Sequence, residues 1–271
     1  MSRPISLAAL TVLELPPPEM VSCAAAAGYS HVGIRLLPAT ATEPTYDLVG
    51  ITPLVREIRA RSADLGIPVL DIEILRLKPE INVKDFAPVF ETGAFLGARY
   101  ALIAGNDPDE ARLTDNFAAL CDLAVGFGIA PQLEPMPWTD AKNVAQAGRI
   151  VRNAGRPNAG VLVDAIHFDR SASSFDDIRA LPAEYFAYAQ ICDAPVPAPT
   201  ELPAILHQAR AERLFPGQGG IDVKGLLTTL PKTTALSLEI PRETLARTVN
   251  ATGRARMALA ALHKVLEELP A

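Results

Sequence analysis

The residues of this sequence that could do chemistry are polar side chains at the ends of apolar segments. Glu134 ends the segment APQLE, Asp164 ends GVLVD, Gln190 lies in FAYAQICD and Glu239 follows ALSL. A charged group in an apolar setting is costly unless it is paired or bound to a metal. A salt bridge would explain one such residue. Four oxygen donors on four successive segments are better explained by one shared site.

The donor types indicate which metal such a site would hold. Carboxylate and amide oxygens suit Mg²⁺ or Mn²⁺ better than structural zinc, which favours Cys and His; Co²⁺ and Zn²⁺ are the other candidates. One divalent ion could polarise a carbonyl and make the neighbouring proton more acidic. Glu134 and Glu239 could then also move protons, as paired carboxylates can. Asp164 and Gln190 are expected to act as ligands only.

His167 follows Asp164 by three residues, in the run DAIH. The spacing predicts that it lies in the loop above the strand, where an imidazole could exchange protons near neutral pH. The other interpretation is a loop histidine that is hydrogen-bonded to backbone. The residues alone leave both open.

Other side chains are candidates for holding a substrate. Arg213 opens the stretch RLFPGQGGID, whose glycine-rich loop could cradle an anion through backbone N–H groups, with Arg213 reaching into the site. Trp138, the only tryptophan, could stack on the apolar face of a polyol, or it could simply fill a gap between loops. The remaining substrate-binding candidates are Glu73, Arg76 and Asp193.

These residues need a scaffold that brings strand ends together, and the pattern of apolar segments along the sequence predicts one. Short apolar segments expected to be strands begin near residues 5, 31, 69, 100, 130, 160, 186 and 235. Nearly continuous apolar runs are typical of parallel strands buried on both faces. Eight such units in 271 residues predict an α/β protein, a single (β/α)8 TIM barrel over residues 1–271. The competing doubly wound sheet is disfavoured because no GxGxxG follows the first strand.

Between the strands, amphipathic stretches with N-cap residues and terminal glycines predict helices. They are expected at Pro17–Ala27, Leu54–Leu65, Asp85–Phe95, Glu110–Phe127, Ala141–Ala154, a short segment opened by Ser174 or Asp176, Ala204–Arg213 and Glu243–Glu268.

Composition narrows the class of protein further. The net charge of −6 argues against a nucleic acid or an anionic membrane as partner, which leaves a small molecule. The cysteines Cys23, Cys121 and Cys192 form no CxxC pair, so neither a disulfide framework nor a thiolate zinc site is expected. The start of the sequence lacks the features of a signal peptide, and no run is long enough to span a membrane. A cytoplasmic location is therefore expected.

The ordered motifs resemble those of the xylose isomerase-like TIM-barrel superfamily. They are Glu134-Pro135, Asp164-x-x-His167, Gln190-x-x-Asp193-Ala194-Pro195, Arg213-x-x-Pro216-Gly217-x-Gly219 and Ser237-Leu238-Glu239. The resemblance implies metal ligation by Glu134, Asp164, Gln190 and Glu239, proton transfer by His167 and substrate contact by Arg213. It also implies that dimers or tetramers are common. The sequence departs from the family pattern at Gln218, where a Glu is often found.

The resemblance covers several reactions. It implies a metal-dependent isomerase or epimerase acting on a sugar, sugar phosphate or cyclic polyol ketone. Gln190 favours the alternative, a lyase of the 3-dehydroshikimate or inosose dehydratase type, because ketose epimerases of the family usually have His there. A barrel that binds a sugar-like ligand without catalysis is the third hypothesis. Endonuclease IV is excluded, since this chain is acidic and has only four histidines.

Overall fold

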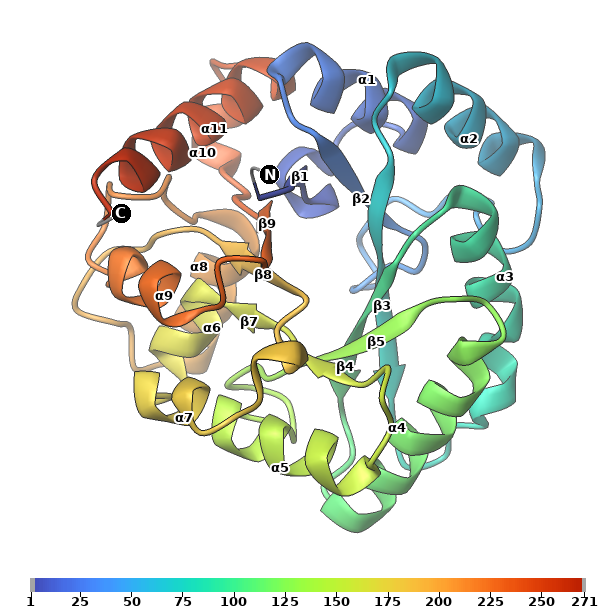
Figure 1. The fold of residues 1–271 in the computed structure, drawn as a ribbon. Coiled ribbons are helices and arrows are strands. Elements are labelled where there is room, and N and C mark those ends of the chain that lie inside the picture. Colours follow the sequence, from blue (N-terminus) through green and yellow to red (C-terminus); the bar gives the residue numbers. More distant parts are fainter. Residues whose placement is uncertain (1–2, 270–271) are drawn as a thin grey trace.

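Parallel strands form a ring in the middle of the molecule, and helices surround this ring (Figure 1). The computed structural model describes residues 3–269, so the two outermost residues at each end of the expected 1–271 unit lie outside it. The described strands are β1 Ile5–Leu7, β2 His31–Arg35, β3 Val69–Leu77, β4 Tyr100–Gly105, β5 Ala130–Glu134, β6 Gly160–Val161, β7 Val163–Asp164, β8 Tyr188–Ile191 and β9 Ala235–Leu238.

The ring closes through a single strand that is interrupted at one residue. The described strands are ordered β6-β5-β4-β3-β2-β1-β9-β8-β7, and every pairing is parallel. The two ends of this order, β6 and β7, are consecutive halves of one chain segment that flank Leu162. The N–H of Leu162 donates to the carbonyl of Leu133 at 3.0 Å, which keeps the segment beside β5. The predicted (β/α)8 barrel is therefore confirmed, and the doubly wound sheet was the wrong alternative.

The surrounding helices begin and end for local reasons that the sequence displays. At α2 the side chain of Thr52 accepts the N–H of Val55, Pro53 fills the first turn, and Gly66 ends the helix with a positive φ of 66°. The described helices are α1 Pro17–Ala27, α2 Pro53–Leu65, α3 Ala87–Leu96, α4 Glu110–Val125, α5 Val144–Ala154, α6 Ala165–Arg170, α7 Phe175–Arg179, α8 Leu202–Ala211, α9 Val223–Thr229, α10 Glu243–Ala246 and α11 Ala251–Glu267; the 3-10 turns are η1 Ala9–Val12, η2 Val83–Phe86 and η3 Ala183–Tyr185.

The first strand is shorter than the apolar run Ile5–Val12 predicts. It ends at Leu7, and the rest of the run forms η1. The hydroxyl of Thr11 donates to the carbonyl of Leu238 at 2.7 Å and accepts the N–H of Ile240 at 2.8 Å. These two bonds join the turn to the end of β9, so tertiary contacts override the local preference for a strand.

Other boundaries differ because a different residue caps the helix. The side chain of Asn143 accepts the N–H of Gln146, so α5 begins at Val144 and not at the predicted Ala141. The predicted final helix is two helices, because Asn250 caps a new one. The segments α6 and α9 are helices that the sequence analysis did not predict. Ser174 does open α7, through a reciprocal capping box with Asp177.

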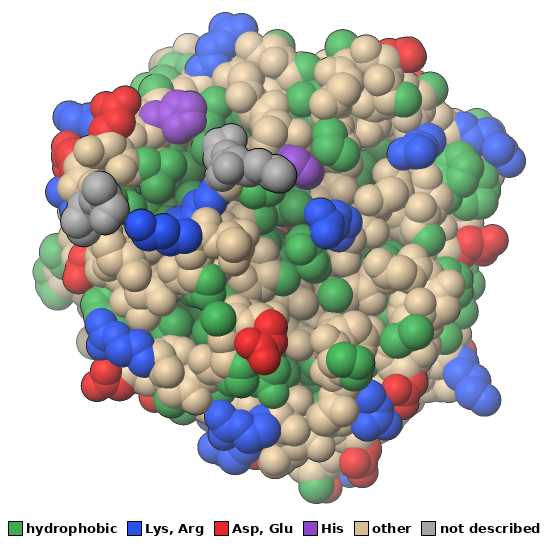
Figure 2. Space-filling model, in the orientation of Figure 1, with side chains coloured by type: hydrophobic (Ala, Val, Ile, Leu, Met, Phe, Trp, Pro, Cys, Tyr) green, Lys and Arg blue, Asp and Glu red, His purple; other side chains and the backbone are tan. Residues whose placement is uncertain are grey.

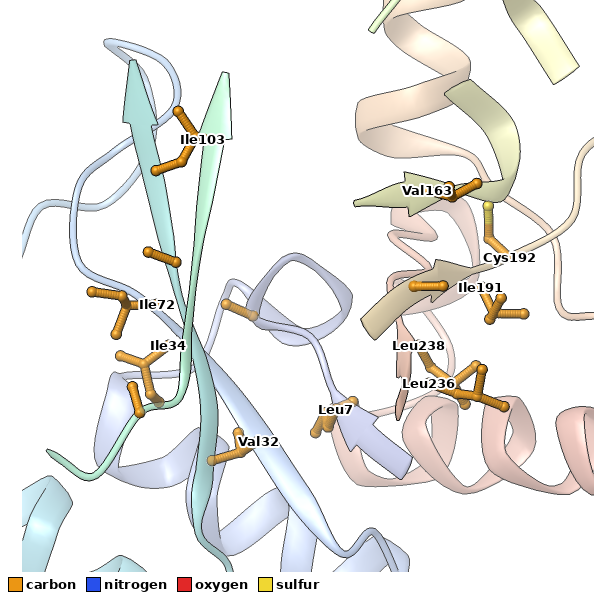
Figure 3. Packing of buried hydrophobic residues seen from close by; sticks show 14 of the residues in the cluster. Leu7, Val32, Ile34, Ile72, Ile103, Val163, Ile191, Cys192, Leu236 and Leu238 are labelled. Carbon is orange, nitrogen blue, oxygen red and sulfur yellow. The ribbon is translucent and has the colours of Figure 1, made fainter. Parts of the chain in front are cut away.

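Apolar packing forms two layers, one on each side of the ring. The outer layer lies between strands and helices, and Figure 3 shows part of it, including Leu7, Ile72 and Leu236. The inner layer lies among residues of several strands, such as Leu102 and Leu162. A ring filled on both sides is rigid, so the residues at the strand ends have fixed positions.

The helices and the displayed face of the molecule can be compared with the expectations drawn from composition. None of the described helices is long and apolar enough to cross a bilayer. On the face shown in Figure 2, outside the grey atoms, acidic and basic side chains are scattered and form no broad field of one sign.

Candidate active site

The four predicted oxygen donors lie together at the carboxyl ends of neighbouring strands. Glu134 ends β5, Asp164 ends β7, Gln190 is in β8 and Glu239 follows β9, and all four are buried. Asp164 and Gln190 are partners in the β7–β8 register, which places them at one level of the barrel. The amide of Gln190 donates to Oε1 of Glu239 at 3.1 Å. The barrel therefore brings these residues to a single mouth.

Two buried arginines partly neutralise this acidic cluster. Nη1 of Arg213 lies 2.6 Å from Oδ2 of Asp164, and Nη2 lies 2.8 Å from Oε2 of Glu239. Arg35 contacts Glu73 at 2.6 Å and Glu239 at 3.8 Å. The guanidinium of Arg213 thus already bridges two of the carboxylates, where the sequence predicted only a side chain reaching for substrate.

Glu134 is the carboxylate in this group that no arginine contacts within salt-bridge distance among residues 3–269. Burial raises the pKa of Glu134 well above its usual value, and the charges of Asp164 and Glu239 add to the rise. Burial also raises the pKa of Glu239 to about 8, although Arg213 opposes part of that rise. Burial alone would raise the pKa of Asp164, but Arg213 holds it below its ordinary range. The site therefore disfavours the ionised forms of Glu134 and Glu239 unless a further positive charge is present.

The donor set fits a divalent cation. Oε1 of Glu134 and Oε1 of Gln190 are buried and have no hydrogen-bond partner among the described residues. Ligand atoms of Glu134, Asp164 and His167 all lie within 4.8 Å of one another. Buried oxygens without partners are costly, and a bound cation would satisfy them while reducing the repulsion between carboxylates. His167 thus joins the residues that could hold the ion, a role the sequence analysis gave only to the four oxygen donors.

His167 lies in a helix, and the prediction that it lies in a loop was wrong. Oδ1 of Asp164 accepts the N–H groups of Ile166 and His167, which caps α6 directly after the strand. Nε2 of the imidazole lies 3.9 Å from Oε1 of Glu134. Trp138 packs edge-on against the ring, with centroids 4.8 Å apart. The tryptophan thus orients the histidine, which neither interpretation of Trp138 from the sequence foresaw.

The protonation of His167 provides a testable pH dependence. Burial lowers its pKa to about 4, partly opposed by Asp164, so the imidazole is neutral at pH 7 and able to accept a proton. An unfolded chain takes up this proton near pH 6.5, while the folded one resists it until about pH 4. The group therefore stabilises the fold above pH 6.5, and this contribution is lost as the pH falls.

We expect the free energy of unfolding of the natural protein to fall between pH 7 and pH 5 by about 2 kcal/mol more than that of His167→Gln. Urea titrations in EDTA at both pH values measure this difference. Identical pH dependence in the two proteins would show that His167 is not held neutral by its surroundings.

Asp193, predicted to bind substrate, instead organises the glycine-rich loop. Its Oδ1 accepts the N–H of Ala194 at 2.8 Å and of Ile221 at 3.0 Å, and its Oδ2 accepts those of Gly217 and Gly219 at 3.0 and 2.9 Å. A Cβ at Gly219 would lie 2.4 Å from Oδ1 of Asp193, so only glycine fits. The loop does cradle an anion, as its composition predicted, but the anion is a carboxylate of the same chain.

Replacing this carboxylate by an amide places an NH2 group against backbone donors. We expect Asp193→Asn to lower the free energy of unfolding by about 3 kcal/mol and to speed amide exchange at Gly217 and Gly219. Asp222→Asn is the control, because Asp222 caps α9 through one exposed bond to Gly225, and little loss is expected there since Asn caps helices about as well as Asp. Equal losses in the two variants, with amide exchange at the loop unchanged, would contradict the role given to Asp193.

The pocket above the donors contains most of the other predicted residues. Arg76, Trp138 and Arg213 line it, whereas Glu73 lies buried beside Arg35 and Asp193 does not line it. The sequence analysis missed Arg210 and Glu43, which also line the pocket. A signal existed for Arg210, which lies in the last turn of α8, three residues before Arg213. Glu43 lies in a polar loop where no pattern marks it.

The fold and the buried donors define an α/β barrel with a candidate metal site at the carboxyl ends of its strands. Residues 21–265 match the family model of the xylose isomerase-like TIM barrel. The chain belongs to this family.

Two kinds of curated relatives match the sequence. A 3-dehydroshikimate dehydratase of Pseudomonas putida is 30% identical over 239 residues, which is 82% of this chain and 36% of that protein. An inosose isomerase of Bacillus licheniformis is 27% identical over 158 residues, 55% of each chain. The chain spans about a third of the length of the dehydratases it matches. These relatives are enzymes.

Solved structures support the fold. A xylose isomerase-like TIM barrel/4-hydroxyphenylpyruvate dioxygenase fusion protein superposes with a TM-score of 0.82 at 25% identity, over 99% of this chain and 43% of that chain. The IOLI protein, solved with a zinc atom, superposes with a TM-score of 0.78 at 18% identity, over 99% of both chains.

Proposed function

We propose that this protein is a divalent-metal-dependent enzyme that removes a proton beside the carbonyl of a small hydroxylated compound. The observation that carries the proposal is the group of buried oxygens without partners, contributed by Glu134 and Gln190 beside Asp164 and Glu239. Buried oxygens without partners lower the stability of the fold, so they need another explanation. The group fits a bound ion and a proton-transfer site.

Asp164, Gln190, Glu239 and Glu134 would hold the ion, with His167 at hand as a further donor. When bound, the ion would polarise the substrate carbonyl and lower the pKa of the adjacent C–H. Arg213 and Arg35 would keep Glu239 in place between them. Substrate would enter through the pocket lined by Arg76, Trp138 and Arg210, with Trp138 against its apolar face.

Glu134 is the best-placed base for the proton. Its Oε1 is buried and has no hydrogen-bond partner among the described residues, so this oxygen is free to accept a proton. Neutral His167, 3.9 Å away, can relay the proton to a departing hydroxyl. The proton and the hydroxyl together leave as water.

We infer dehydration as the outcome of this proton transfer. The dehydratase relative matches more of this chain, and at higher identity, than the inosose isomerase does. Gln190, the residue that favoured a lyase in the sequence, donates its amide to Glu239 at 3.1 Å among the candidate ligands. Isomerisation is the second candidate, supported by the inosose isomerases, and it differs only in returning the proton to carbon.

Product mass separates the two reactions. Protein supplied with Mn²⁺ is incubated in D2O with 3-dehydroshikimate, with an inosose and with allulose. A product lighter by one water supports the dehydratase, and a product with retained composition and incorporated deuterium supports the isomerase. Protein treated with EDTA is the control. If none of the three compounds is dehydrated or exchanges a proton, the proposed reaction is wrong for these substrate types.

A further inference from the structure

A second pocket lies next to the candidate active site and shares a wall with it. Leu10 and Arg210 line both pockets. The second is bounded by η1, the chain around α10 and the start of α11, and its cavity volume is about 470 Å³. The free volume of the first is only about 50 Å³. The room for a sizeable ligand beside the candidate site is therefore in the second pocket.

The walls of this second pocket carry an excess of positive charge. Four arginines face two glutamates, which gives a local charge of +2 in a chain whose net charge is −6. One of the glutamates, Glu14, is already paired with Arg254. Glu243 is the other. The four arginines are Arg210, Arg242, Arg247 and Arg254.

Several guanidinium donors in this pocket have no acceptor. Arg254 is only 3% exposed, yet its Nε has no hydrogen-bond partner among the described residues. Nε of Arg242 is also buried without a partner in residues 3–269. The side chain of Arg247 is exposed, and no hydrogen bond or ion pair links it to another described residue. The buried Nε atoms of Arg242 and Arg254 are shielded from the pocket, whereas the exposed guanidinium of Arg247 can meet an acceptor from outside the chain.

The guanidinium of Arg242 is held in place by uncharged neighbours, and no carboxylate neutralises its charge among the described residues. It lies over the ring of Phe215, 4.8 Å from the centroid, and Nη1 donates to the amide oxygen of Gln218 at 3.3 Å. Gln218 is uncharged, so it orients Arg242 and leaves the positive charge in place. Guanidinium groups bind phosphate and carboxylate through paired hydrogen bonds, which few other side chains can offer.

We propose that this second pocket binds an oxyanion, the phosphate or carboxylate of a small molecule, through Arg242, Arg247 and Arg254. The shared wall allows two sources for the group: the far end of a ligand that also enters the first pocket, or a separate anion. The proposal does not depend on the reaction proposed above, because binding alone tests it.

Inorganic phosphate is the first probe, titrated calorimetrically at constant ionic strength against a chloride blank. We expect saturable binding to the natural protein and affinity weakened about tenfold or more in Arg242→Gln/Arg247→Gln. The single variant Arg247→Gln, which removes no side-chain hydrogen bond or ion pair to the described residues, keeps the test valid if the double variant unfolds. Arg152→Gln, an exposed arginine on α5, is the control and should bind like the natural protein. The proposal would be overturned if phosphate showed no saturable binding beyond the heat of the chloride blank, or if the double variant bound phosphate with the same affinity as the natural protein.

Ribose 5-phosphate distinguishes the two sources of the oxyanion. Tighter binding than inorganic phosphate, weakened by Trp138→Ala in the first pocket, would show a ligand that spans both pockets. Equal affinities for the two probes, unaffected by Trp138→Ala, would show a separate anion site.

Discussion

Glu134→Gln should lower kcat/KM by about a thousandfold, because the substitution removes the proposed base while preserving its shape. The same change has a second, opposite effect on stability. The folded chain raises the pKa of Glu134, so ionised Glu134 costs stability once the pH exceeds its unfolded value. Without metal, the glutamine variant should therefore be more stable than the natural protein at pH 7.5.

Added Mn²⁺ should reverse this order. The ion stabilises whichever protein binds it more tightly, and the natural carboxylate is the better ligand. Thermal unfolding of both proteins, with EDTA and with Mn²⁺, gives the four values needed. Glu110→Gln, at an exposed carboxylate paired with Arg149, is the control and should keep full activity. A Glu134→Gln protein with natural activity, or with an unchanged response to Mn²⁺, would remove Glu134 from the site.

Arg213→Met should cost about 3–5 kcal/mol of unfolding free energy in EDTA, the largest stability effect expected in this chain. The side chain is 2% exposed and is the shared counter-charge of Asp164 and Glu239. Removing it leaves two buried carboxylates facing each other. A divalent cation bound between them should restore part of the loss, so Mn²⁺ should raise the Tm of the variant more than that of the natural protein.

Two further variants make this experiment decisive. Arg213→Lys keeps the charge but cannot bridge two carboxylates with a planar group, so an intermediate loss is expected, and it remains measurable if Arg213→Met fails to fold. Arg156→Met removes an exposed pair with Asp122 and should have little effect. An Arg213→Met protein as stable as Arg156→Met would show that the buried carboxylates do not rely on this arginine.

The sequence predicted the donors of the site because each follows an apolar run. Once the runs are interpreted as parallel strands of a barrel, their carboxyl ends must converge, and so the sequence predicted that Glu134, Asp164, Gln190 and Glu239 lie near one another without any knowledge of the loops. The same reasoning failed where a side chain turns back on the protein itself. Arg213 pairs with Asp164, 49 positions earlier, and Asp193 accepts loop N–H groups up to 28 positions later. The spacing of residues along the sequence does not indicate contacts between positions so far apart.

Helix boundaries near the site show the same limit. Asp164 was recognised as a ligand candidate, yet its other role as the cap of α6 decides where His167 points. The turn η1 has the composition of a strand and is held by Thr11 bonds to the end of β9. In the first case the side chain of Asp164, at the end of a strand, bonds to the backbone of the helix that follows. In the second case Thr11 bonds to backbone that is more than 200 residues away in the sequence. Only the folded arrangement reveals these contacts.

Glu134, Asp164, Gln190 and Glu239 are proposed to hold one divalent ion at the barrel mouth. Anomalous scattering from a crystal grown with Mn²⁺ would locate that ion. We expect one strong peak among these four side chains, and its loss in Glu134→Gln crystals. Density for Mn²⁺ only at surface carboxylates, with the mouth containing no anomalous peak, would contradict this proposal.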